Sequence, residues 1–272
     1  MKLTQAILPV AGLGTRFLPW TKVVPKELLP IGNQPIIALL VDECLSVGIN
    51  NICFVINRGK EAIPQYFYDM PELEQELKRR GKSHLLEELA RYHNVNFHVV
   101  YQHELHGDGH ALLQARDWVQ GELTAVLFGD DLISGRENGL QQMAKAIGGL
   151  PDPEKKAMLC LQDVPREKVS KYGIVDVAPA IGERLYRVKD LVEKPEPLHA
   201  PSTLGIVGKY LVPKAIFDQL HKIEEGSHGE IRLIDALIRE RKTVEIYGYA
   251  FEGTRFDTGT PEGYKEAVKA LG

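Results

Sequence analysis

The 272-residue chain has few cysteines, no long apolar run and no excess of positive charge, and each of these shortages excludes a class of protein. Its three cysteines, Cys44, Cys53 and Cys160, are far apart and form no C-x-x-C pair, so the sequence predicts buried thiols in a reducing compartment rather than disulfides or a zinc site. No apolar run approaches the roughly 18 residues that cross a membrane. Pro9 and Gly12 interrupt the N-terminal apolar stretch that a signal peptide would need. We therefore expect a soluble, cytoplasmic protein without a membrane partner.

The net charge of −4 gives no basic surface of the kind that binds nucleic acid, so we expect no nucleic-acid partner. A chain that is 44% hydrophobic can bury a sizeable core. We predict one domain over residues 1–272, with a charged helical insertion at about residues 60–92. In that insertion, two charged runs flank Gly81 and predict two helices joined near this glycine. Their charges indicate either a solvated helix face or a surface for a partner.

Strand and helix patterns alternate along the chain. A buried apolar strand at residues 6–10, an amphipathic helix over residues 36–48 and a second strand at residues 51–56 form a βαβ unit, which predicts an α/β fold with a parallel sheet. Further strands are expected at residues 95–100, 123–128, 158–163, 202–211 and 244–251, and a strand pair at residues 172–177 and 187–192 around Gly182. Further helices are expected at residues 111–119, 213–220, 229–240 and 262–271.

The first strand runs into a glycine-rich loop, Ala11-Gly12-Leu13-Gly14-Thr15-Arg16. Its two glycines allow positive φ and close approach of the backbone to a ligand, and such a loop turns N–H groups toward a phosphate. The alternative is a simple tight turn. The loop lacks the Gly-Lys-Ser/Thr ending of a Walker loop and is not a full dinucleotide fingerprint. With Arg16 and Lys26 as nearby cations, we interpret it as a loop that holds a nucleoside triphosphate.

Carboxylates follow two other strands. Asp130 and Asp131 end the apolar strand at residues 123–128, where Mg²⁺ would find the one or two carboxylates it prefers. We assign Asp130 as the metal ligand and expect Asp131 to cap a turn or helix. Asp257, in an Asp-Thr-Gly turn, is either structural or a second carboxylate for the same ion.

Two more segments carry polar residues at strand ends, where ligands sit in open α/β sheets. Gln102 has the amide donor and acceptor that pair with a pyrimidine edge, and Gly107 and Gly109 permit close approach. The nearby histidines, His103, His106 and His110, are interpreted as polar loop residues rather than a metal cluster.

The pair Glu193-Lys194 is either a surface ion pair of little energetic value or a site group. Its place at a strand end before Pro195 favours the second interpretation. Lys194 would then contact a phosphate and Glu193 sugar hydroxyls, with the backbone N–H of Gly173 beside them.

These segments together resemble the bacterial UTP–glucose-1-phosphate uridylyltransferase family of sugar nucleotidyltransferases over essentially the whole chain. The motifs that carry the resemblance are AGLGTRFLPWTK, PKELLP, HGDGHA, GDDL, KYGIVD, VEKP, APSTLGIVGKY, GEIRLIDAL and FEGTRFDTG. The resemblance implies a Rossmann-like α/β fold, with a mixed, mostly parallel sheet flanked by helices. It also implies Mg²⁺-dependent conversion of UTP and glucose 1-phosphate into UDP-glucose and pyrophosphate, and a homo-oligomer, either a dimer or a tetramer.

The family's residue roles transfer only to matching positions. Ala11 and Gly12 match the nucleotide loop, Gln102 and Gly107 the base-reading positions, Gly173, Glu193 and Val207 the sugar side, Asp130 the metal ligand, and Arg16, Lys26 and Lys194 the phosphate contacts expected to act in catalysis. Gly14 is assigned to the nucleotide loop, and Asp257 to the metal, from the local pattern rather than from the resemblance.

Three positions depart from the family pattern. Asp108 stands where an apolar residue is common, Leu13 replaces a frequent tyrosine, and RFDTGT is closer to the thymidylyltransferase branch. The open alternatives are therefore a thymidylyl- or guanylyltransferase acting on another sugar 1-phosphate, and a non-catalytic regulatory paralogue.

Overall fold

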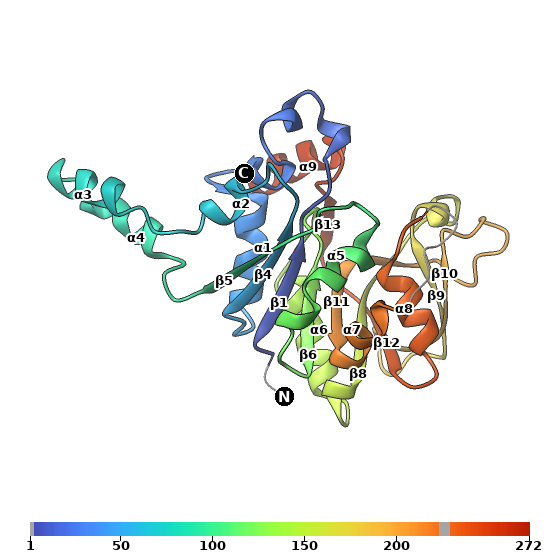
Figure 1. Ribbon diagram of the computed structural model, residues 1–272. Coiled ribbons are helices and arrows are strands. Elements are labelled where there is room, and N and C mark those ends of the chain that lie inside the picture. Colours follow the sequence, from blue (N-terminus) through green and yellow to red (C-terminus); the bar gives the residue numbers. More distant parts are fainter. Residues whose placement is uncertain (1–2, 223–228) are drawn as a thin grey trace.

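A computed structural model describes residues 3–222 and 229–272. Within these residues, nine strands form a central sheet in the order β5-β4-β1-β6-β11-β8-β12-β10-β9 (Figure 1). Their pairings make β10 and β11 run opposite to the other seven, which confirms the mixed, mostly parallel sheet. The strands are β1 Gln5–Pro9, β4 Asn51–Ile56, β5 Asn96–Tyr101, β6 Leu123–Leu127, β8 Lys156–Asp163, β9 Gly173–Val177, β10 Leu185–Glu193, β11 Leu204–Pro213 and β12 Glu245–Ala250.

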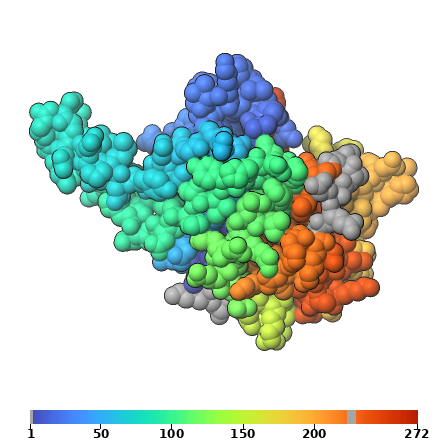
Figure 2. Space-filling model, viewed as in Figure 1, coloured from blue at the N-terminus to red at the C-terminus, as the bar shows by residue number. Residues whose placement is uncertain are grey.

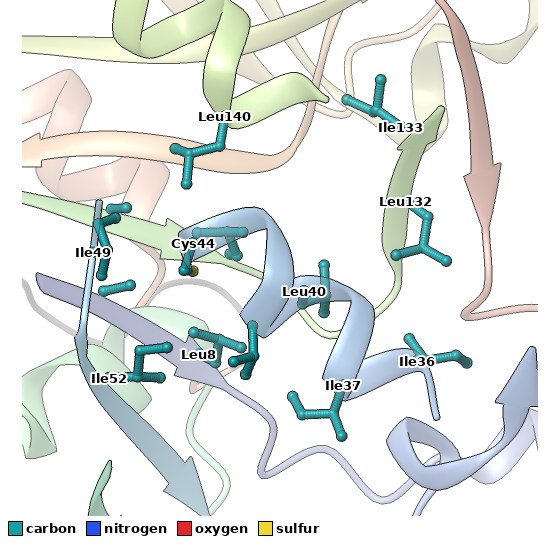
Figure 3. Packing of buried hydrophobic residues seen from close by; sticks show 14 of the residues in the cluster. Leu8, Ile36, Ile37, Leu40, Cys44, Ile49, Ile52, Leu132, Ile133 and Leu140 are labelled. Carbon is teal, nitrogen blue, oxygen red and sulfur yellow. The ribbon is translucent and has the colours of Figure 1, made fainter. Parts of the chain in front are cut away.

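Helices cover both faces of the sheet, because successive strand side chains point to opposite faces. Leu8 of β1 packs with helices α1 (Ile36–Leu45) and α6 (Gly139–Gly148) on one face. Figure 3 shows Leu8 and Ile52 beneath Leu40 and Cys44 of α1. Ile7 belongs to the opposite core, under α5 (Asp108–Gln114), α7 (Lys214–Leu220) and α8 (Leu233–Glu240). The last helix, α9 (Pro261–Leu271), adds Ala267 to the first face.

The segment predicted as a helical insertion contains α2 (Ala62–Gln65), which lies against the core through Ile63, and α3 (Pro71–Arg79) and α4 (Leu86–Ala90). Helices α3 and α4 project away from the sheet (Figures 1 and 2), and Gly81 takes a positive φ of 68° between them. Neither α3 nor α4 has a buried residue. Their charges form exposed pairs such as Glu76 with Arg80, which fits a solvated face.

All three cysteines are buried and unpaired, as predicted. Burial raises the pKa of the Cys53 thiol to about 12, and it also raises the pKa of Cys44 and Cys160. In the described part of the chain, no helix is both long enough and apolar enough to cross a membrane.

Several elements match their prediction closely. β4 has the expected bounds, Gly48 ends the turn after α1 with a φ of 83°, and β9 and β10 pair as an antiparallel hairpin. Two predicted helices begin elsewhere: α5 starts at Asp108 rather than residue 111, and α8 starts at Leu233 rather than residue 229. Pro213, expected inside a helix, ends β11.

Asp131 does not cap a turn or helix, so that prediction was wrong. It begins β7 (Asp131–Ser134), which pairs with β13 (Thr254–Asp257) in a separate two-stranded ribbon. One carboxylate oxygen accepts the N–H of Gly208 at 2.7 Å, and the other pairs with the guanidinium of Arg255. The side chain therefore joins the ribbon to β11, and the pairing of β7 with β13 brings Asp257 beside the end of β6.

A second short ribbon, β2 (Pro30–Ile31) with β3 (Gln34–Pro35), precedes α1.

Candidate active site

Two adjoining cavities open at the carboxyl ends of β1, β5 and β6, and they share Asp108 and Asp130. The first has a volume of about 270 Å³ and the second about 690 Å³. Among the predicted site residues, the first is lined by Ala11, Gly12, Lys26, Gln102, Gly107 and Asp130. The second is lined by Arg16, Asp130, Gly173, Glu193, Lys194 and Asp257. Residues spread over most of the chain thus converge on one continuous site.

The two glycines of the glycine-rich loop, Gly12 and Gly14, have different roles, which the sequence did not distinguish. A Cβ added at Gly12 would meet nothing within 4 Å, so this residue leaves the first cavity open. Gly14 is not among the residues lining either cavity. It takes a positive φ of 64° at the start of the 3-10 turn η1 (Thr15–Phe17), and its carbonyl accepts the hydroxyl of Thr21 at 2.8 Å. That turn carries Arg16 to the second cavity.

Lys26 contacts the predicted metal ligand directly, since its Nζ lies 2.7 Å from Asp130 Oδ2. Burial opposes ionisation of both groups, but their attraction outweighs it. The pKa of Lys26 is therefore raised and the pKa of Asp130 is lowered from its ordinary value. Lys26 is thus a cation and Asp130 an anion at the junction of the two cavities.

Asp130 and Asp257 face the same small space. A Cβ at Gly259 would lie 2.7 Å from Asp130 Oδ2 and 3.0 Å from Asp257 Oδ1, so no larger residue fits between them. Asp257 Oδ1 also accepts the N–H of Gly259 at 3.0 Å. Asp257 therefore has both the turn contact and the position near Asp130 that the sequence offered as alternatives. Two carboxylates that converge in a polar cleft suit a hard divalent cation.

A second buried ion pair supports this arrangement and was not predicted. Lys60 Nζ lies 2.8 Å from Glu27 Oε2 and donates to the carbonyl of Val10 at 2.6 Å. The pair ties the glycine-rich loop to the segment that carries Lys26. The available signal was Glu27 beside the apolar Leu28-Leu29-Pro30, because an acidic residue that becomes buried near apolar residues usually has a partner.

Gln102 is 3% exposed and lies at the wall of the first cavity. Its Nε2 donates to the carbonyl of Gly107 at 3.0 Å and lies 3.1 Å from His110 Nδ1. The amide nitrogen therefore holds the loop in shape. His110 also contacts Gln114, and its ring lies 5.4 Å from that of His106.

The glycines of this loop are required by packing rather than by space for a ligand. A Cβ at Gly107 would lie 2.6 Å from the carbonyl oxygen of Ile231, and one at Gly109 would lie 2.7 Å from the carbonyl carbon of Arg232. The segment before α8 is pressed against the loop, which explains why both positions exclude a side chain.

The sugar-side residues gather around the end of β10. Lys194 Nζ lies 3.3 Å from Glu193 Oε1, and Gly173 is paired with Glu193 across β9 and β10. The backbone N–H of Lys194 donates to the carbonyl of Tyr172 at 3.0 Å, at a φ of 47° that L-residues seldom adopt. Val207 is 2% exposed in the core and is not among the residues lining the second cavity.

Several further side chains that line the second cavity, Arg255 and Arg232 among them, were not assigned there from sequence. Arg255 contacts the Tyr172 hydroxyl at 3.2 Å and pairs with Asp131, and Arg232 reaches Glu193. Each joins segments more than 35 residues apart, so no local pattern could reveal the contact.

Comparison with known proteins agrees with this geometry. The model of the nucleotidyl transferase family matches residues 5–272. The UTP–glucose-1-phosphate uridylyltransferase of Bacillus subtilis is 40% identical over 266 residues, which span 97% of this chain and 89% of that protein. UTP–glucose-1-phosphate uridylyltransferase 2 of Staphylococcus saprophyticus is 40% identical over 264 residues, spanning 97% and 90%.

Solved structures give the same result. A UDP-glucose pyrophosphorylase complexed with UDP-glucose has a TM-score of 0.85 at 34% identity and covers 98% of both chains. The UTP-bound UGPase from Acinetobacter baumannii has a TM-score of 0.89 at 35% identity, covering 98% of this chain and 92% of that one. The chain therefore belongs to the nucleotidyl transferase family, and the resemblance to its UTP–glucose-1-phosphate uridylyltransferase branch, inferred from the motifs, is confirmed.

Proposed function

We propose that this chain transfers a uridylyl group from UTP to glucose 1-phosphate, releasing pyrophosphate and forming UDP-glucose. The observation that carries the proposal is that the two cavities meet at Asp130, with Lys26 lining the first cavity and Lys194 and Arg16 lining the second. This is the arrangement that an in-line displacement at phosphorus needs, because the attacking and departing groups lie on opposite sides of the reacting atom. Full-length similarity to uridylyltransferases supports the choice of nucleotide and sugar.

In this proposal the first cavity takes the nucleotide. Gly12 and Ala11 border the nucleoside, and Gln102 and the loop it supports border the base. Arg16 and Lys26 stabilise the departing pyrophosphate. Glu193 accepts hydroxyl groups of the sugar and Lys194 binds its phosphate, whose oxygen attacks the α-phosphorus. No protein nucleophile is needed, so the chain contributes positioning and charge neutralisation.

We further propose that Mg²⁺ binds between Asp130 and Asp257. The fit follows from two carboxylates that face one small space, and a bound Mg²⁺ would neutralise charge on the phosphate oxygens. Lys26 donates a hydrogen bond to Asp130. In this proposal its ammonium group pairs with that carboxylate in the free protein and with the triphosphate once UTP is bound.

The remaining organisation is also a proposal. We infer that residues 1–272 act as one nucleotidyltransferase domain with the insertion at about residues 60–92, and that the active protein is a homo-oligomer, a dimer or a tetramer. The three unpaired thiols fit a reducing compartment, so we place the reaction in the cytoplasm. Light scattering of the purified protein tests the oligomeric state.

A matrix of nucleoside triphosphates against sugar 1-phosphates, with pyrophosphate release as the readout, tests the reaction. We expect UTP with glucose 1-phosphate to be the preferred pair. Preference for dTTP or GTP would make the chain a thymidylyl- or guanylyltransferase, and binding without turnover would make it a regulatory paralogue. The presence of Arg16, Asp130 and Lys194 around one cavity favours a catalyst over that paralogue.

A further inference from the structure

The loop that borders the base is joined firmly to the segment that enters α8. The N–H groups of Gly109 and His110 donate to the carbonyl of Ile231 at 2.9 and 3.2 Å, and the N–H of Ile231 donates to the carbonyl of His106 at 2.8 Å. The carboxylate of Asp108 accepts the N–H of Leu233, the first residue of α8, at 2.8 Å. Arg232, between Ile231 and Leu233, is therefore placed by contacts from both sides.

The guanidinium of Arg232 is fixed along one edge. Its Nε and Nη2 donate to the two carboxylate oxygens of Asp235 at 2.9 Å each. Such a fork holds the plane of the guanidinium in one orientation. The remaining nitrogen, Nη1, lies 3.6 Å from Glu193 Oε1, and the side chain is 30% exposed toward the second cavity. One edge is thus anchored and the other faces the residue proposed to bind the sugar.

Glu193 Oε1 is shared by two cations. It lies 3.3 Å from Lys194 Nζ as well as 3.6 Å from Arg232 Nη1. In the proposed reaction Lys194 must turn to the incoming phosphate. Without another cation, that movement would leave the Glu193 carboxylate unpaired, and the Glu193–Lys194 pair would compete with substrate.

We propose that Arg232 is a positioning residue for the sugar half of the site. It holds the Glu193 carboxylate in the orientation that accepts sugar hydroxyls, and it compensates that charge when Lys194 engages the phosphate. Asp235 orients Arg232, and Asp108 fixes the backbone that carries it. The ligand class is a 1-phosphate of a hexose with uncharged ring substituents, whose hydroxyls donate to Glu193 and whose anionic phosphate binds Lys194. This inference rests on the proposed function.

The test is steady-state kinetics of R232A, E193Q and the double variant, with UTP and glucose 1-phosphate varied separately. We expect R232A to raise KM for glucose 1-phosphate roughly tenfold, the effect of losing one charge-assisted contact, with little change in KM for UTP. If the two residues act together, the double variant loses much less than the product of the two single losses. R232K keeps the charge but loses the fork, so it recovers part of the affinity.

The matched control is R239A, which removes the same charge from α8, the helix that begins directly after Arg232. Arg239 is exposed and donates to the carbonyl of Lys222 rather than lining the cavity, so its KM values should match those of the wild type. If R232A unfolds, R232Q and D235N replace it, because both keep the bulk of the side chain while weakening the contact with Glu193 or the fork.

The outcomes separate this inference from the proposed function. A wild-type protein that does not transfer uridylyl groups refutes the function itself. With an active wild type, three results overturn the role of Arg232: an unchanged KM for glucose 1-phosphate, an equal rise in both KM values, or independent effects of R232A and E193Q.

Discussion

Lys194 combines an unusual backbone conformation with the chemical role proposed for it. A non-glycine residue at a φ of 47° is uncommon, and such residues cluster at functional sites when the surrounding structure holds them there. We expect Lys194→Ala to lower kcat by at least ~10²-fold, because it removes one preorganised charge contact. Assays with UTP and glucose 1-phosphate check this, and a Lys194→Ala enzyme with normal turnover would exclude the role.

The same position allows backbone strain to be separated from chemistry. Lys194→Gly and Lys194→Ala remove the same amine, but only glycine adopts a positive φ without steric cost. We therefore expect the glycine variant to be the more stable of the two by about 1 kcal/mol, with equal losses of activity. Urea denaturation measures the difference. Equal stabilities would mean that Lys194 stores no strain.

Asp130 should control the response of the enzyme to Mg²⁺. Replacing it by asparagine removes one of the two anionic ligands proposed for the ion while keeping the shape, so we expect Asp130→Asn to need a higher Mg²⁺ concentration for half-maximal activity. The measurement is a Mg²⁺ titration of pyrophosphate release, with the exposed Asp117→Asn as the control. An identical titration curve for Asp130→Asn would count against the metal assignment.

Much of the site could be predicted at the residue scale because its residues follow strand ends. Gln102 directly follows β5 and Asp130 stands a few residues after β6, and the carboxyl ends of parallel strands meet at one edge of the sheet. Glu27, Asp131 and Arg232 could not be placed, because their partners come from distant segments and their local patterns fit a surface equally well.

At the scale of elements, helix α8 shows why boundaries were missed. The sequence pattern extended it back to residue 229, yet Arg232 is extended at φ −117° and ψ 147°. The N–H of Leu233, one of the helix-start N–H groups that have no acceptor within the helix, is bonded by Asp108 from another helix. A cap supplied across the fold leaves no local signal, so only the structure could locate this helix start.

Asp108 also makes stability at this junction depend on pH. Burial, assisted by the charge of Glu193, raises the pKa of its carboxyl to about 6, although the N–H of Leu233 and the charge of Arg232 oppose the rise. The folded state therefore holds a proton that the unfolded chain releases at lower pH. The contribution of Asp108 to the stability of the folded protein is therefore lost as pH rises from about 4 to above 6.

Asparagine at position 108 would keep the acceptor for Leu233 without the charge. We expect the melting temperature of Asp108→Asn to match that of the wild type near pH 4 and to exceed it by roughly 2 to 5 °C above pH 7. Thermal unfolding from pH 4 to 8 measures the difference. A difference that is constant across this range would show that Asp108 is not protonated at low pH in the folded protein.

At the scale of the whole molecule, the parallel half of the sheet could be predicted from the sequence, but the order of its strands could not. The βαβ pattern predicted β1 and β4 side by side, and they pair in parallel. However, β11 lies between β6 and β8, so strands about 80 residues apart are neighbours. This order depends on which hydrophobic faces fit together over the complete chain, and no local period encodes it.

One buried ion pair holds this long-range arrangement together. Lys209 of β11 is 0% exposed, and its Nζ lies 2.7 Å from Glu43 Oε2 of α1. The other oxygen of Glu43 accepts the N–H of Leu140 at the start of α6 at 2.8 Å. The pair therefore joins the central sheet to two helices of the same face, across 166 positions of sequence.

We expect Lys209→Met to lower the free energy of unfolding by about 3 to 5 kcal/mol, because it leaves the Glu43 carboxylate buried without its cation. Urea denaturation followed by circular dichroism measures the change. Lys145→Met, which removes an exposed partner of Glu137, should cost less than about 1 kcal/mol. Adding Glu43→Gln to Lys209→Met should recover part of the loss, because a neutral amide costs less to bury and can still accept the N–H of Leu140. A double variant with a lower free energy of unfolding than Lys209→Met would mean that lost packing around the lysine stem, rather than an uncompensated charge, accounts for the destabilisation.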